Sequence, residues 1–102
     1  MLQVPLQAVA NQQVTTLLGT QTCQLALYQK SQGLFVDLAV NGKNISTGVL
    51  ALNGVSICPF GYADFSGYLF FADLQGSDDP NYELLGTRYV LIYMTEAELA
   101  NL

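Results

Sequence analysis

Apolar and polar side chains alternate along two neighbouring stretches of the chain. Residues 23–28 read CQLALY and residues 34–40 read LFVDLAV, so that every second side chain in each stretch is apolar. A period of two is typical of a β-strand that buries one face. The segment Lys30–Gly33 between them is short and ends in glycine, which favours a tight turn. The pattern therefore predicts two antiparallel strands joined as a hairpin.

Two Asn-Gly pairs bound the next stretch of the chain. Asn41-Gly42 and Asn53-Gly54 each combine the two residue types that best tolerate the positive φ angles of a type I′ turn. We expect residues 45–52 between them to form a strand. Gly48 interrupts this strand, which indicates a β-bulge or a close backbone contact.

Two later stretches are apolar on both faces. Residues 68–74 read YLFFADL and residues 88–94 read RYVLIYM. A strand of this kind must be covered on both sides. The polar residues 75–80 between them contain the glycine, aspartates and proline of a loop. Near the start, Pro5 lacks an amide donor and is tolerable only at a sheet edge, which makes residues 2–7 an edge strand.

The C-terminal segment shows a helix start signal. Thr95 and Glu98 have the spacing of a capping box, in which each side chain bonds the other residue's amide, and we expect about two helical turns to follow. The whole pattern predicts an all-β fold, a small antiparallel β-sandwich or partly open barrel with a short C-terminal helix, as a single domain over residues 1–102. About eight short strands are expected, at residues 2–7, 13–18, 23–28, 34–40, 45–52, 55–58, 68–74 and 88–94.

The composition indicates that the chain is a subunit of an assembly and not a free domain. Of the 102 residues, 51% are hydrophobic and only 11% are charged, whereas ordinary domains carry about 25% charged residues. A monomer with so few charges leaves apolar groups on its surface, as subunits do whose faces are closed by neighbours. Edge strands and long loops are the places where a small β-domain adds a partner. We therefore predict a protein interface at Leu2, Val4, Tyr82, Leu84 and Leu85.

The charge balance excludes two classes of partner. The net charge is −5 and the three cations are dispersed, so the chain repels the phosphates of nucleic acid and of anionic membranes. The first residues lack the basic start and the uninterrupted apolar stretch of a signal peptide, and no apolar run is long enough to cross a membrane. We expect synthesis in a cytoplasm.

The side chains needed for common catalytic and metal sites are missing. The chain has no histidine, so that a Ser-His or Cys-His pair cannot form, and its two cysteines cannot complete a zinc site. Cys23 and Cys58 are interpreted as buried thiols. Asp78-Asp79 lacks the other ligands of a calcium loop and is expected to be a solvated turn. The acids Asp37, Asp64 and Asp73 show no spacing that singles out a catalytic pair, and we expect surface acids, no enzyme, no metal and no cofactor.

Aromatic residues crowd into a dozen positions between residues 60 and 71. Such clusters can stack sugars or bases. The alternative hypothesis is therefore a small-molecule or carbohydrate-binding β-barrel that uses the aromatic residues between Tyr62 and Phe71.

Three stretches in order resemble one known family. They are LQVPL followed by NQ within residues 2–12, NG, GV and NG within residues 41–54, and LGT, LIY and TEAEL within residues 85–99. Together they resemble the small baseplate plug proteins of contractile-tailed bacteriophages, typified by a cyanophage baseplate plug. The resemblance implies a structural virion protein of the tail baseplate that plugs the lower end of the tail tube and bridges the central hub. It implies no active site, and as partners the hub, tube, spike or tape-measure end and sister copies.

Overall fold

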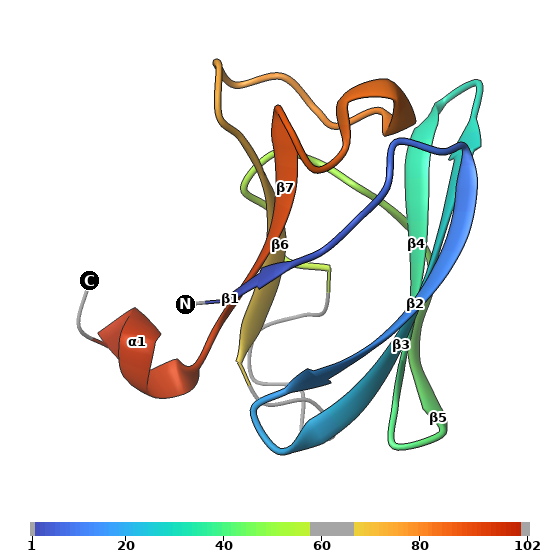
Figure 1. Ribbon diagram of the computed structural model, residues 1–102. Helices are drawn as coiled ribbons and strands as arrows, with labels where there is room; N and C mark the ends of the chain where they lie inside the picture. The colour runs from blue at the N-terminus through green and yellow to red at the C-terminus, as the bar shows by residue number, and fades with distance from the viewer. Residues whose placement is uncertain (1, 58–66, 101–102) are drawn as a thin grey trace.

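The computed structural model describes residues 2–57 and 67–100, and they form two antiparallel sheets that face each other (Figure 1). A 3₁₀ turn, η1 (Tyr82–Leu84), precedes the last strand, and a helix, α1 (Glu96–Ala100), follows it. The three-stranded sheet has the order β1-β7-β6, and the four-stranded sheet has the order β2-β3-β4-β5. The strands are β1 (Leu2–Val4), β2 (Asn11–Leu18), β3 (Gln21–Lys30), β4 (Gly33–Val40), β5 (Lys43–Leu50), β6 (Tyr68–Asp73) and β7 (Tyr89–Met94).

The predicted all-β sandwich is confirmed, and its core lies between the sheets. The inward side chains of β3 and β4 are the ones that alternate in the sequence, and the apolar residues of β6 and β7 lie against them from the other sheet. Each large apolar side chain buried in this way stabilises the fold by about 1.5–3 kcal/mol. The largest of the fully buried side chains are Val4, Leu18, Cys23, Leu25, Leu27, Leu34, Val36, Leu38, Ile57, Leu69, Phe71 and Leu91.

The four-stranded sheet is a meander whose turns follow the prediction in two places. β3 and β4 pair antiparallel across a two-residue turn, with Lys30 opposite Gly33. Between β4 and β5, Asn41 (φ 52°) and Gly42 (φ 84°) both have the positive φ of a type I′ turn. The prediction for the second Asn-Gly pair is wrong in detail, because only Gly54 has a positive φ there.

Both faces of β7 are covered, as its sequence predicts. Tyr89, Leu91 and Tyr93 are buried on one face, and Val90 and Met94 are buried on the other. β7 is the central strand of its sheet, with β1 on one side and β6 on the other.

Three strand predictions need correction. β1 ends at Val4, because Pro5 has no amide to continue the ladder, and β2 begins at Asn11, earlier than expected. Residues 55–57 are not a strand: Ser56 forms a single bridge with Phe70, and the Ile57 amide bonds the Leu69 carbonyl. Cys58 lies outside the described residues. The described part of the chain therefore has seven strands.

The capping box is present in full. The Thr95 amide donates to Glu98 Oε1 at 2.9 Å, and the Glu98 amide donates to Thr95 Oγ1 at 3.2 Å. The helix that follows spans five residues, which is shorter than the two turns predicted.

Candidate functional site

The five residues predicted to form an interface differ in their exposure to solvent. Leu2 and Leu84 are exposed, at 44% and 42%. Val4 and Leu85 are buried in the core at 1% and 2%, so the expectation that they lie on the surface is wrong. Tyr82 is half-buried and packs against the core.

The position of each strand residue explains part of this difference. Val4 lies opposite Leu91 near the middle of β7, where the second sheet covers it. Leu2 faces the same way but lies opposite Tyr93, closer to the end of β7. A single strand thus contributes one core residue and one surface residue.

The stretch from Tyr82 to Tyr89 ties the two sheets together. The Tyr82 amide donates to Gln29 Oε1 on β3 at 3.1 Å. Leu85 forms a bridge with Tyr89, and the Gly86 amide donates to the Tyr89 carbonyl at 2.8 Å. Leu85 is therefore an anchor of this connection, and Leu84 is its exposed neighbour.

An ion pair between the half-buried Arg88 and Asp73 holds the polar loop before η1. Arg88 donates from Nε to Asp73 Oδ1 at 2.8 Å and from Nη2 to Asp73 Oδ2 at 2.9 Å, and Nη2 also bonds Asp78 Oδ2 at 2.9 Å. The Asp73 side chain is fully buried, which corrects the expectation of a surface acid. Hydrogen bonds from the guanidinium hold the pKa of Asp73 well below its usual range, and the same contact raises the pKa of Arg88.

The same carboxylate organises the backbone of the loop. Asp73 Oδ1 accepts from the Gln75 amide and Oδ2 from the Asp78 amide, each at 2.9 Å. Asp79 Oδ1 accepts from the Asn53 amide at 2.9 Å. The Asp78 side chain is 71% exposed, in agreement with a solvated turn. The described residues contain no group of three or more potential metal ligands.

Asp37 also has a structural role. Its Oδ1 accepts from the Tyr28 hydroxyl at 2.9 Å and from the Gly48 amide at 2.7 Å. Gly48 has φ 65° and lies where the β4–β5 register is irregular, so the predicted bulge is confirmed. The hydrogen bond to Asp37 raises the pKa of Tyr28. Asp64 lies outside the described residues.

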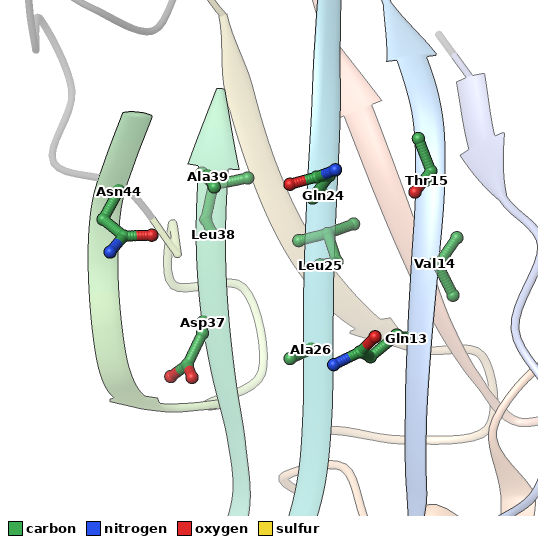
Figure 2. A pocket seen from close by; sticks show the side chains of 10 residues that line it. All are labelled: Gln13, Val14, Thr15, Gln24, Leu25, Ala26, Asp37, Leu38, Ala39 and Asn44. Atoms are coloured by element: carbon green, nitrogen blue, oxygen red, sulfur yellow. The ribbon is translucent and has the colours of Figure 1, made fainter. Parts of the chain in front are cut away.

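The outer face of the four-stranded sheet carries a shallow groove of about 300 Å³ (Figure 2). Polar side chains from four neighbouring strands line it, namely those of Gln13, Gln24, Asp37 and Asn44. No aromatic side chain lines it. A sugar would find no stacking surface there.

The described aromatic residues of the alternative hypothesis do not gather on one surface. Phe71 is buried in the core. Tyr68 and Phe70 form a tilted ring pair with centroids 5.3 Å apart. Phe60, Tyr62 and Phe65 lie outside the described residues.

Cys23 is buried in the core, as predicted. Burial raises the pKa of its thiol to about 11, so that almost none of the reactive thiolate forms near neutral pH. The environment is that of an inert packing residue.

The positions of the charges reveal a surface feature that composition alone does not show. Residues 1–29 contain no charged side chain, and the first is Lys30. We call residues 1–29 the uncharged segment. It includes β1, β2 and most of β3, and it carries the exposed apolar residues Leu2, Val9 and Leu17. Reading charge position along the sequence would have found it.

Neither helical element in the described part of the chain has the length and apolar character to cross a membrane. A family model described as "Cyanophage baseplate Pam3 plug gp18" matches residues 1–96. No curated protein matches the chain.

Proposed function

The chain belongs to the cyanophage baseplate plug family, and from this premise we propose that it is a structural protein of a phage tail baseplate. The match spans residues 1–96, which include every strand described above. This is the observation that carries the proposal. A plug of this kind works by burying surface against its neighbours and not by turning over a substrate.

We further propose where the chain acts. It plugs the lower end of the tail tube and bridges the central hub to the proteins around it, after synthesis in the cytoplasm of the bacterial host. Its partners are other tail and baseplate proteins, among them the hub, the tube and the spike or tape-measure end, together with sister copies. The low charge content supports this reading, because charged residues are depleted at the centre of protein interfaces.

The uncharged segment is the surface we assign to these contacts. A specific interface buries at least about 1,000 Å² in total. Leu2 provides an exposed apolar side chain within this segment, and Leu84, which lies outside it in η1, provides a second one. Val4 and Leu85 act indirectly, because they fix the backbone on which these neighbours are presented.

Charged substitutions at the exposed positions test the proposal. In a phage that carries L2E and L84E, we expect less of the protein in purified tails and fewer infectious particles, because the new carboxylates would be buried without partners. Q32E is the matched control, since Gln32 is exposed in the turn between β3 and β4. Normal, infectious tails assembled without any copy of the protein would contradict the proposed role.

A further inference from the structure

The four sheet edges of this fold differ in how well they are protected. β1 is only three residues long and ends before Pro5. The free side of β6 is covered, because the Gly54 and Ile57 amides bond the Phe71 and Leu69 carbonyls. Short strands and covering segments of this kind prevent unwanted pairing.

The two edges of the four-stranded sheet differ from each other. β5 begins with Lys43, and its pairing with β4 shifts register around the bulge at Gly48. β2 pairs with β3 without interruption over eight residues, from Asn11 opposite Tyr28 to Leu18 opposite Gln21. It contains no charge, proline or glycine. Among the residues that the structure describes, β2 therefore has none of the usual devices that protect an edge.

The backbone groups on the free side of β2 follow from its register. In an antiparallel pair, every second residue of a strand exchanges backbone hydrogen bonds with the neighbouring strand. Leu18 lies opposite Gln21 at the two-residue turn, and the Gln29 amide donates to the Ala10 carbonyl at the other end. The even-numbered residues of β2 therefore bond β3. The odd-numbered residues Gln13, Thr15 and Leu17 then direct their amides and carbonyls outward. No described residue bonds these outward groups. Leu17 is also 62% exposed.

We propose that β2 pairs antiparallel with β2 of a second copy of this chain. The choice of a second copy rests on charge. The chain carries a net charge of −5, and all eight acidic side chains lie beyond residue 29, so a contact between the uncharged segments of two copies brings no acid of one segment against an acid of the other. Two identical antiparallel strands are related by a two-fold axis, which makes the contact self-complementary.

The outward groups define the register of this pair. Thr15 lies opposite Thr15 of the second copy, and Gln13 lies opposite Leu17. Directly opposite threonines are a favourable cross-strand pair. The pairing joins the two four-stranded sheets into one continuous sheet and covers the exposed Leu17 side chain. The inference deepens the proposed function and rests on it for sister copies as partners, whereas contacts with hub and tube proteins do not depend on the β2 pairing.

Introducing a positive or a negative charge at Thr15 tests both the partner and the register. Multi-angle light scattering with size-exclusion chromatography should show wild-type protein moving with concentration toward twice the 11.1 kDa chain mass. T15K and T15E should each weaken the dimer about tenfold, since each places like charges opposite each other at the two-fold axis. An equimolar mixture of T15K and T15E should associate again. T47K and T47E on β5, where Thr47 is exposed at the opposite edge, are the matched controls and should dimerise as the wild type does.

Hydrogen exchange gives an independent measurement that needs no variant. The amides of Gln13, Thr15 and Leu17 should become protected as the protein concentration rises. The proposal is overturned if the wild-type chain stays monomeric up to its solubility limit, or if the Thr15 and Thr47 variants behave alike. It is also overturned by a dimer that leaves these three amides exchanging freely, or by protection that appears only with another tail protein.

Discussion

Adding one methyl group at Gly86 tests how closely the connection after β1 packs against the loop before β7. Gly86 has φ 87°, and a Cβ there would lie 2.8 Å from the backbone carbonyl oxygen of Leu6. The Gly86 amide is bonded to the Tyr89 carbonyl, and this restrains the loop from moving aside. Gly86→Ala therefore combines a strained backbone with a contact that the surroundings must relieve.

Gly42→Ala provides the matched control. Gly42 has φ 84°, nearly the same as Gly86, but a Cβ there meets no atom within 4 Å. The left-handed backbone costs either alanine about 1–2 kcal/mol. Overpacking against Leu6 adds about 1–3 kcal/mol at Gly86 alone. We expect Gly86→Ala to lose about 2–5 kcal/mol in total, and Gly42→Ala only the first part.

Urea unfolding followed by circular dichroism measures both losses. The unfolding midpoint should fall in the order wild type, Gly42→Ala, Gly86→Ala, with similar slopes if all three unfold in two states. Equal losses for the two variants would show that Leu6 does not pack against the Gly86 loop.

Three further predictions concern the cap, the ion pair and the thiol. Thr95→Ala should lower the free energy of unfolding by about 1 kcal/mol, because it removes a capping bond, whereas Thr95→Ser should keep most of the wild-type stability. An unchanged thermal midpoint for Thr95→Ala would mean that the helix frays independently of the sandwich. Because Arg88 depresses the pKa of Asp73 in the folded state, the stability from this pair is complete above the ordinary value of 3.8 and is lost as the pH falls below it. The thermal midpoint of Asp73→Asn should therefore fall less steeply than that of the wild type as the pH is lowered through the acid range. Parallel curves of midpoint against pH for the two proteins would refute this. Iodoacetamide should label Cys23 slowly in the folded protein at neutral pH and rapidly in urea, as read from the mass of its peptide, and equal rates would contradict its burial.

Features that depend on nearby residues were predictable from the sequence. The alternation in β3 and β4 identifies their buried faces because the side-chain period is a property of the strand itself. Asn41-Gly42 specifies its turn through local φ preferences, and Thr95 and Glu98 bond each other within one helical turn. Each of these features involves partners only a few residues apart.

Features that depend on distant segments were not predictable in the same way. The burial of Val4 depends on where β1 lies along β7, and nothing in its own neighbourhood distinguishes it from Leu2. The Asp73–Arg88 pair joins residues on either side of a loop, and either one alone resembles an ordinary surface charge. The cover over β6 comes from Gly54 and other residues that precede it in the chain. These contacts arise from packing and not from local pattern.

The candidate interaction surface falls between these cases. The absence of charge from residues 1–29 is visible in the sequence alone. Its meaning depends on the sheet order, which shows that β2 is an edge strand with one free side. Composition thus predicts that the chain has partners, and topology identifies the free side of β2 as a place where we propose that one binds.

Cryo-electron microscopy of tails purified from the phage that encodes this chain tests the central claim most directly. We expect the sandwich to fit density in the baseplate at the lower end of the tail tube, with the uncharged segment buried against neighbouring protein. Baseplates that contain no copy of the chain, or copies whose uncharged segment faces solvent, would contradict it.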